Sequence, residues 1–583
     1  MASIAFLCLE MGTLKILALL VAAVALSECR YVDPFYEEGW QMDIDSACDY
    51  FRDRNNKQPN IVYIMADDLG WNDVGFHNSK VKTPNIDALR AKGIELTQSY
   101  MQPVCSASRS AFLTGKYPSN NGLQLLVLIQ EAPSCLPIEH KTLFQYMQEE
   151  GYTTKQVGKW HLGYCDENCL PNSRGVHEFR GVNTGAVDYW NWTDHGVYQR
   201  QKNGQPNVDG LGNHLTVQDQ IDVRELILAH QGRVDPLFMW LTPTAPHDPL
   251  QPTIEMYNVH NFLNPANEEE NYRREYLGLV AHFDALLGTT MQALEEAGMA
   301  DNTIILFTSD NGGASQSVSF GGHEYFANNY PLRGGKTTFS EGGVRIPTVY
   351  YDPRLHPRTQ GTSRDFLIHV TDWLPTFVQL AKKGSKECNF KIKGTDGVSQ
   401  LANLGSTYNL PERRKYNLRK EMLVALSDAT GDVQNPSMCA TEDGAYRWKD
   451  YKLIYGDQYY LTDPATVETE WPIPQEWPEY PAIYGDDCHR TVNGMRVVRC
   501  LFNVVDDPSE THNLYDEEPE IVKTLVEKIQ AYKEMSVKPV YRTSYGVTGT
   551  TTQGWNYGYI IPRHDYCYPP SNFPLQPNDP SCY

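Results

Sequence analysis

The sequence predicts an α/β protein with a large mixed, mostly parallel sheet sandwiched by helices, followed by a smaller C-terminal domain of antiparallel sheet plus helix. Solid apolar runs at residues 61–66, 237–241 and 303–309 are typical of parallel strands buried on both faces. Helical patterns separate these runs, which indicates strand–helix–strand units. This alternation fades after about residue 384, where Tyr, Trp and turn residues become frequent.

The predicted helices of the larger part have recognisable boundaries. A helix over residues 83–93 ends at a glycine, and a second over residues 106–114 stops at Gly115. The longest, at residues 272–297, has an apolar stripe at helical spacing, so we expect it to cover the sheet. Another begins near Thr371, with a proline in its first turn.

The C-terminal part carries different signals. Short strands at residues 453–455 and 501–503 predict a small antiparallel sheet, and a helix at 519–535 is expected to pack on it. With 583 residues the chain is long enough for two domains, which we place at residues 58–384 and 385–583.

The N-terminus reads as a targeting segment. Residues 16–26 are continuously apolar and follow Lys15, but the run is too short to span a bilayer. We therefore interpret residues 1–27 as a signal peptide, with Met11 as an alternative start. No later stretch predicts a membrane anchor, so we expect a secretory-pathway protein that is secreted or lysosomal.

Charge and cysteine content restrict the partners. The formal net charge of −22 argues against binding to nucleic acid or to an anionic membrane, although a local cationic pocket could still hold an anionic substrate. Thirteen cysteines suit an oxidising compartment, and Cys567 and Cys582 are expected to staple the tail. The tripeptide Asn191-Trp192-Thr193 is a glycosylation sequon.

Oxygen-bearing side chains follow two of the predicted strands. Asp67 and Asp68 come directly after the first apolar run, and Asp310 and Asn311 follow the third. Asp-Asp before glycine is also an ordinary turn. Because ligands of open α/β sheets collect beyond the carboxyl ends of strands, these four side chains could converge on one Ca²⁺ or Mg²⁺.

Cationic groups and histidines occur between these two sites. Lys159 and His161 are two residues apart and would share one face of an extended strand. His247 lies in a proline-rich loop after the second apolar run, and Lys336 lies in a glycine-rich segment. A solvated lysine and a hydrogen-bonded histidine are the structural alternatives.

Cys105 stands at the start of the helix over residues 106–114, where unpaired N–H groups make an anion site. Arg109 lies on the next turn and can reach back toward Cys105. The common alternative for a lone cysteine in a secreted chain is burial or a disulfide.

These residues resemble the signature of the type I, formylglycine-dependent sulfatases, C-x-P/A-x-R followed by T-G. The matching positions are Cys105, Ala107, Arg109, Thr114 and Gly115, with Ala107 standing where most members have proline. Four further segments resemble the family as G-K-W-H-L-G, P-H-x-P-L, R-G-x-K and D-P-x-E-x-x-N-L, at residues 158–163, 246–250, 333–336 and 507–514.

The resemblance implies an alkaline-phosphatase-like fold and hydrolysis of aryl or sugar O-sulfates, with residues 58–384 as the catalytic domain. It implies that a formylglycine-generating enzyme converts Cys105 during maturation. The metal would be one Ca²⁺, or Mg²⁺, held by Asp67, Asp68, Asp310 and Asn311 together with the modified Cys105. The sulfate pocket would contain Lys159, Lys336, His161 and His247.

Residue 105 would then be the nucleophile, held in register by Arg109. His247 would protonate the leaving oxygen and His161 would remove a proton from residue 105, although these two roles are interchangeable at this point. Two other functions stay open. One is a phosphate-ester hydrolase of the same superfamily, and the other is a catalytically weak or inactive secreted sulfatase-like binding protein.

Segments around Cys135, Cys169 and residues 247–251 look most like the arylsulfatase B group. In that group the first two cysteines pair, so the resemblance implies a Cys135–Cys169 disulfide. The group's own enzymes are N-acetylgalactosamine-4-sulfatase-like. Residues 337–340 stand where B-type enzymes tend to have bulkier tryptophans, so the galactosamine-sulfate specificity is not carried over.

Overall fold

The computed structural model describes most of the chain between residues 57 and 560. The ranges it leaves out there are 125–126, 129–133, 195, 316–325, 383–389, 406–417, 428–442, 457–487, 493–494, 538–539, 541–554 and 557–558. The predicted signal peptide and the predicted pairing of Cys567 with Cys582 lie outside the described residues.

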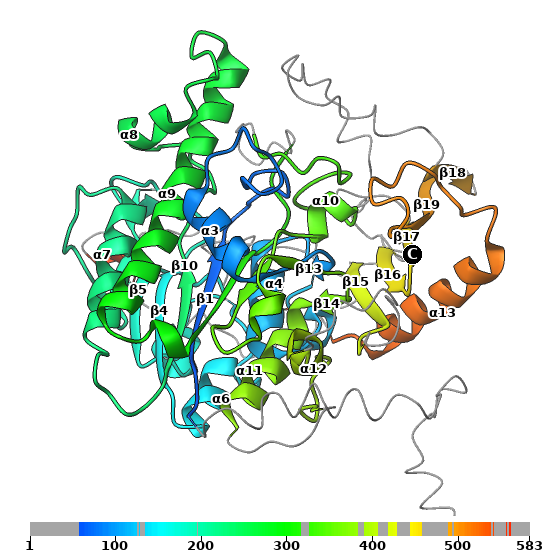
Figure 1. Cartoon of the computed structure of the whole chain (residues 1–583). Coiled ribbons are helices and arrows are strands. Elements are labelled where there is room, and N and C mark those ends of the chain that lie inside the picture. The colour runs from blue at the N-terminus through cyan, green and yellow to red at the C-terminus, as the bar shows by residue number, and fades with distance from the viewer. Residues whose placement is uncertain are drawn as a thin grey trace, which may run out of the picture. The chain divides into compact units, whose positions relative to one another are not determined.

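A ten-stranded sheet forms the α/β part (Figure 1), in the order β13-β2-β12-β11-β1-β10-β4-β5-β8-β9. The strands are β1 (Asn60–Ala66), β2 (Ile94–Leu96), β4 (Thr153–Lys159), β5 (Glu178–Val182), β8 (Arg200–Lys202), β9 (Gln205–Pro206), β10 (Leu237–Thr242), β11 (Thr303–Ser309), β12 (Val349–Tyr351) and β13 (Thr362–Arg364). The five neighbours from β11 to β5 are parallel, whereas β12, β8 and β9 pair antiparallel. The mixed, mostly parallel sheet is therefore confirmed.

Helices cover both faces of this sheet, and alternate residues of β1 point into two separate cores. Tyr63 packs against Phe112, with ring centroids 4.5 Å apart, in the core formed with α4 (Cys105–Thr114), α6 (Leu143–Glu149) and α11 (Trp373–Ala381). Ile64 belongs to the core formed with α3 (Pro84–Lys92), α7 (Leu215–Leu228) and α9 (Glu268–Glu296). All of β1 is buried, which accounts for its continuously apolar sequence from Ile61 to Ala66.

Two helix boundaries show how local chemistry sets the ends. Helix α9 begins four residues before the predicted start, because the side chain of Asn267 accepts the N–H of Glu270 and the first turn is acidic. Helix α4 ends as predicted, with Gly115 in the left-handed region at φ 63°.

The C-terminal sheet is antiparallel, as predicted, in the order β15-β16-β17-β19-β18. Its strands are β15 (Glu421–Ser427), β16 (Asp443–Trp448), β17 (Tyr451–Gly456), β18 (His489–Val492) and β19 (Met495–Asn503). Helix α13 (Pro519–Met535) packs on it through Leu525 and Ile529 (Figure 1). The domain boundary near residue 384 stays a prediction.

Shorter elements complete the described part. The strands are β3 (Ser99–Tyr100), β6 (Thr193–Asp194), β7 (Val197–Tyr198), β14 (Ile368–His369), β20 (Trp555–Asn556) and β21 (Tyr559–Ile560). The α-helices are α5 (Pro118–Asn121), α8 (Ile254–Tyr257), α10 (Glu341–Val344) and α12 (Leu401–Gly405). The 3-10 turns are η2 (Glu167–Cys169), η3 (Pro171–Arg174), η4 (Asn258–His260), η5 (Ala300–Asn302), η6 (Pro357–Thr359) and η7 (Val370–Asp372).

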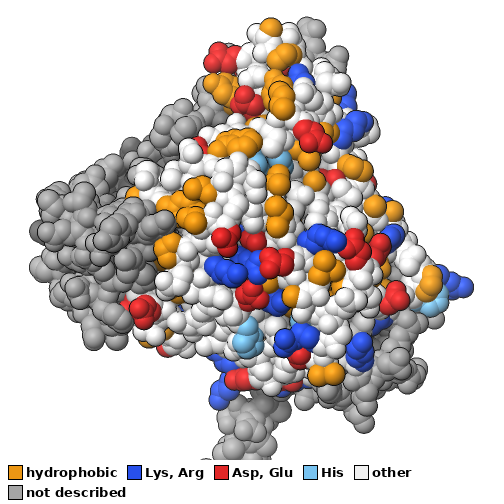
Figure 2. Space-filling view, turned by 90° about the vertical axis from the view of Figure 1, so that its left-hand side faces the viewer, with side chains coloured by type: hydrophobic (Ala, Val, Ile, Leu, Met, Phe, Trp, Pro, Cys, Tyr) orange, Lys and Arg blue, Asp and Glu red, His pale blue; other side chains and the backbone are white. Residues whose placement is uncertain are grey.

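Two disulfides link cysteines in the described part of the chain. Cys135 pairs with Cys169, as the family resemblance implied, and Cys488 pairs with Cys500. On the face shown in Figure 2, acidic and basic side chains are interspersed in small groups. Among the described residues, no helix has both the length and the apolar character that crossing a membrane requires.

Candidate active site

The sheet order brings the predicted site residues together. Strands β11, β1, β10 and β4 are consecutive neighbours, and all four run in the same direction. Their carboxyl ends therefore open on one edge, the usual ligand edge of an α/β sheet. Asp310 and Asn311 follow β11, and Asp67 and Asp68 follow β1. Lys159 is the last residue of β4.

Cys105 meets this edge from the first position of α4. Its thiol donates to Asp67 Oδ1 at 3.6 Å, and its side chain is buried. One ligand atom from each of Asp67, Asp68, Cys105 and His247 lies within 4.8 Å of the others. Burial, with repulsion from Asp310, raises the pKa of the Cys105 thiol above its usual range. Cys105 is a free thiol, so it is not in a disulfide.

Two lysines approach the carboxylates closely. Lys159 Nζ lies 2.6 Å from Asp67 Oδ2, and Lys336 Nζ lies 2.6 Å from Asp68 Oδ2. Lys336 Nζ is also 3.1 Å from His247 Nε2. Lys159 is fully buried, so the alternative of a solvated lysine is wrong.

Arg109 connects the end of β11 with the end of β4. Its guanidinium donates twice to Asp310 Oδ2, at 2.9 and 3.1 Å, and once to the Lys159 carbonyl at 2.9 Å. Burial alone would raise the pKa of Asp67, but attraction by Lys159 and the other nearby cations holds it well below its usual range. Burial and then repulsion from Asp67 raise the pKa of Asp310 above its usual range.

The two histidines occupy different environments. His247 Nδ1 lies 2.8 Å from both the carbonyl and a carboxylate oxygen of Asp248, and Nε2 is 3.6 Å from Asp68 Oδ2. Burial and Lys336 oppose protonation of His247, yet the carboxylates of Asp68, Asp248 and Asp67 outweigh them and raise its pKa above the usual value. The nearby carboxylates therefore stabilise the protonated form of His247 relative to a free imidazole.

His161 differs from the prediction. It does not share a strand face with Lys159, because β4 ends at Lys159 and His161 has φ 56°. Its Nε2 lies 3.1 Å from the Leu128 carbonyl, and its buried Nδ1 has no hydrogen-bond partner among the described residues. Burial, together with Lys159 and Arg109, lowers the pKa of His161 far below the usual value, so this imidazole is neutral.

The donor set fits a hard cation. Asn311 Nδ2 donates to Asp68 Oδ1 at 2.7 Å, which turns the amide oxygen away from that carboxylate. The amide oxygen, Asn311 Oδ1, is buried and has no hydrogen-bond partner in the described part of the chain. The unpartnered amide oxygen and the buried carboxylates of Asp67, Asp68 and Asp310 are oxygen donors of the kind that Ca²⁺ and Mg²⁺ prefer.

Several supporting residues were missed by sequence reasoning. The Tyr189 hydroxyl donates to the His247 carbonyl at 2.9 Å, and the Tyr189 N–H donates to Gln251. His214 stacks on Tyr189 with ring centroids 4.9 Å apart, and His282 stacks on His214 at 4.0 Å. These side chains hold the loop that carries His247. No motif marks them, because each acts through a contact distant in sequence.

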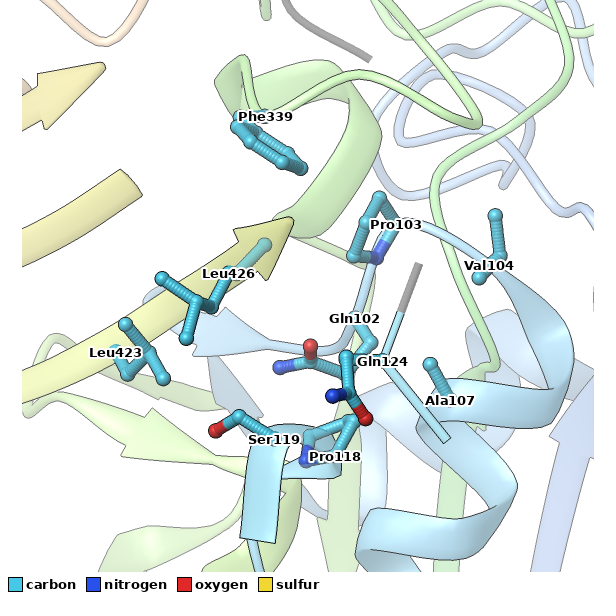
Figure 3. A pocket seen from close by; sticks show the side chains of 11 residues that line it. Gln102, Pro103, Val104, Ala107, Pro118, Ser119, Gln124, Phe339, Leu423 and Leu426 are labelled. Carbon is cyan, nitrogen blue, oxygen red and sulfur yellow. The ribbon is translucent and has the colours of Figure 1, made fainter. Parts of the chain in front are cut away.

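A small pocket lies between the start of α4 and β15 (Figure 3). Ala107, Val104 and Pro103 form one wall, and Leu423 and Leu426 of β15 form another. Ala107, the position that departs from the family signature, therefore lines this small pocket from the helix that carries Cys105.

Comparison with known proteins identifies the family. The sequence model of the family described as "Sulfatase" matches residues 59–383. Arylsulfatase J of Mus musculus is 31% identical over 500 residues, covering 83% of this chain and 77% of the relative. Arylsulfatase A of Homo sapiens is 31% identical over 377 residues, covering 60% and 69%. Human N-acetylgalactosamine-6-sulfatase is 30% identical over 321 residues, covering 51% and 57%.

Solved structures share the fold. Ps i-CgsB in complex with k-i-k-neocarrahexaose matches with a TM-score of 0.66 and 25% identity, over 85% of this chain and 96% of that one. Phosphonate monoester hydrolase of Agrobacterium radiobacter matches at 0.53 and 17% identity, over 82% and 96%, which shows a common fold alone. The fold is thus the expected alkaline-phosphatase-like one, and with the family match over residues 59–383 the chain belongs to the sulfatase family.

Proposed function

We propose that this sulfatase cleaves aryl or sugar O-sulfates with a formylglycine made from Cys105 and with one Ca²⁺, or Mg²⁺, at the strand exits. The observation that carries the proposal is the buried group in which Cys105 lies 3.6 Å from Asp67, between two lysines and three carboxylates. The modified residue and the cation would supply an activated oxygen nucleophile at neutral pH. Asp67, Asp68, Asp310 and Asn311 would hold the cation beside residue 105.

The lysines have charge to offer a sulfuryl group. Lys159 and Lys336 contact Asp67 and Asp68, whose charge the cation would share, so both ammonium groups can turn to the sulfuryl oxygens. Fixed cations there stabilise the charge that builds up during transfer. Arg109 would keep Asp310 in place through its two hydrogen bonds.

The histidine environments favour one assignment of roles. His247, whose pKa is raised, would donate the proton from Nε2 to the leaving oxygen. His161, whose pKa is lowered and whose Nδ1 is unpartnered, would accept a proton from residue 105. The sequence left the acid and base roles of these two histidines interchangeable, and we propose His247 as the acid and His161 as the base.

The finer identity is also a proposal. The arylsulfatase B-like group stays a proposal based on the resemblance of the segments around Cys135, Cys169 and residues 247–251. The disulfides favour maturation in the secretory pathway to a secreted or lysosomal protein. Asn191 of the sequon is exposed, which is compatible with a glycan. The partners we propose are a sulfated small molecule or glycan and, during maturation, the formylglycine-generating enzyme.

Mass spectrometry of residue 105, in protein from a secretory host, tests this function together with hydrolysis of nitrophenyl sulfate. We expect formylglycine and sulfate release, and Cys105→Ala should remove both. An unmodified or disulfide-bonded Cys105 would contradict the enzymatic function and favour a binding protein. Faster turnover of nitrophenyl phosphate than of the sulfate would favour the phosphate-ester hydrolase.

A further inference from the structure

The loop that carries Lys336 is held from the C-terminal sheet by one buried ammonium group. Lys452 lies on β17 and is fully buried. Its Nζ is 2.8 Å from Glu341 Oε1 and 2.7 Å from Glu510 Oε1, and it donates to the Phe339 carbonyl at 3.0 Å. Both Glu341 and Phe339 belong to the segment that follows Lys336.

Both ends of this loop rest on Glu510. The Glu341 N–H donates to Glu510 Oε2 at 2.7 Å, and Arg333 Nη1 donates to the Glu510 carbonyl at 2.9 Å. Lys336 lies between these two anchors. Between them the backbone is also tied to the α/β part, since the Lys336 N–H donates to the Gly313 carbonyl at 3.1 Å and the Thr337 N–H donates to the Pro103 carbonyl at 2.8 Å.

Phe339 adds an apolar anchor between the same two parts of the chain. In Figure 3 its ring faces the pocket whose other walls include Leu426 of β15 and Pro103. The loop therefore reaches the C-terminal sheet through a charged and an apolar contact, while its tip reaches Asp68 and His247.

Stability alone does not explain this charged cluster. Replacing a buried ion pair by apolar residues of similar volume is often neutral or stabilising. The Lys452 cluster instead fixes direction and distance, since its ammonium has three acceptors and Glu341 also accepts the Tyr100 hydroxyl at 2.6 Å. Such a contact suits a loop whose tip must hold an ammonium within hydrogen-bond distance of two groups.

We propose that Lys452 is a positioning residue that sets the place of Lys336 in the active site through Glu341 and Glu510, so that the C-terminal sheet completes the catalytic centre. This inference rests on the proposed function, in which Lys336 binds the sulfuryl group.

The test is a double-mutant cycle with Lys452→Met and Lys336→Ala, using a fluorogenic aryl sulfate. Because small misplacements of catalytic groups cost about 10²-fold in rate, Lys452→Met should lower kcat/KM by about that factor. In the Lys336→Ala background the same change should have less than about a twofold effect, since the group that it positions is gone. The control is Arg200→Met, which removes from β8 a buried cation that is paired with Asp219 and Asp222 of α7.

Four outcomes are decisive. Equal losses from Lys452→Met in both backgrounds, or a loss from Arg200→Met as large as that from Lys452→Met at a matched melting temperature, would overturn the positioning role. If Lys336→Ala alone is fully active, the proposed sulfate contact fails instead. If Lys452→Met does not fold, Glu510→Gln replaces it in the same cycle, because glutamine keeps an acceptor for the Glu341 N–H. A loss of kcat/KM from Glu510→Gln that disappears in the Lys336→Ala background supports the proposal.

Discussion

The stacked pair His214 and His282 should make stability fall steeply in mild acid. Both rings are buried, and their planes are only 7° apart. His214 Nε2 lies 3.1 Å from the Gln251 carbonyl, and His282 Nε2 accepts the Thr253 N–H at 3.1 Å. Burial lowers the pKa of His214 to about 4, and burial with repulsion from His214 lowers the pKa of His282 to about 3.

The sign follows from proton linkage. The unfolded chain takes up a proton on each imidazole near its ordinary pKa of 6.5, whereas the folded chain does so only near 4 and 3. Stability is therefore lost as the pH falls below 6.5, until the folded-state pKa is reached. From about pH 7 to about pH 5 each histidine contributes a loss of roughly 2 kcal/mol, and the pair about 4 kcal/mol.

Denaturant unfolding measures the stability of the wild type and of His214→Gln/His282→Gln at about pH 7 and at about pH 5. Comparing the stability that each protein loses isolates the contribution of the two histidines, because the other titrating groups are the same in both proteins. The double variant should lose about 4 kcal/mol less stability than the wild type on acidification. His512→Gln, a change at an exposed histidine, controls for the loss of an imidazole from the chain. Equal acid sensitivity of the double variant and the wild type would refute the reasoning.

Three further predictions concern the catalytic centre. His247→Ala should barely slow hydrolysis of nitrophenyl sulfate but should slow that of a sugar sulfate by about 10²–10⁴-fold, because only the basic sugar alkoxide needs a proton; equal kcat losses on both substrates would remove His247 as the acid. Ala107→Pro should fold, because Ala107 is in the first turn of α4, where proline is tolerated. This variant should raise the fraction of residue 105 that mass spectrometry finds as formylglycine. A lower fraction in Ala107→Pro than in Ala107→Gly would contradict the prediction. A calcium concentration of about 100 times its Kd should stabilise the folded protein by about 2.7 kcal/mol, seen as a higher melting temperature that a chelator reverses. Asp310→Asn should abolish that shift, and stoichiometric zinc by elemental analysis would count against a hard-cation site.

Local sequence patterns predicted those parts of the site that depend on strands and helix ends. The oxygen side chains after β1 and β11 lie together because parallel strands end on one edge, and apolar runs reveal such strands directly. Lys159 and His161 would share a face only in an extended strand, and that condition is not met, because β4 ends at Lys159 and His161 has φ 56°. No residue pattern signals that turn.

Lys452 and Tyr189 could not be found from local patterns, because their partners lie about 110 and 60 residues away. One signal was present for Lys452. A charged residue interrupts the apolar side of a short strand, and a buried charge needs a partner. The partner could be identified only from how the loops that carry Glu341 and Glu510 pack together, and sequence periodicity does not encode such packing.

The order of the central strands has a consequence for synthesis of the protein. Strand β1 lies between β10 and β11, whose first residues, Leu237 and Thr303, emerge long after Asn60. At ribosomal rates of about 5–20 residues per second, both edges of β1 wait for roughly 10–50 s before their partners exist. During that interval a seven-residue, mostly apolar segment with open backbone edges is exposed, and such segments readily pair with other chains. Yield in a recombinant host should therefore depend on translation speed and on chaperones that shield this nascent strand.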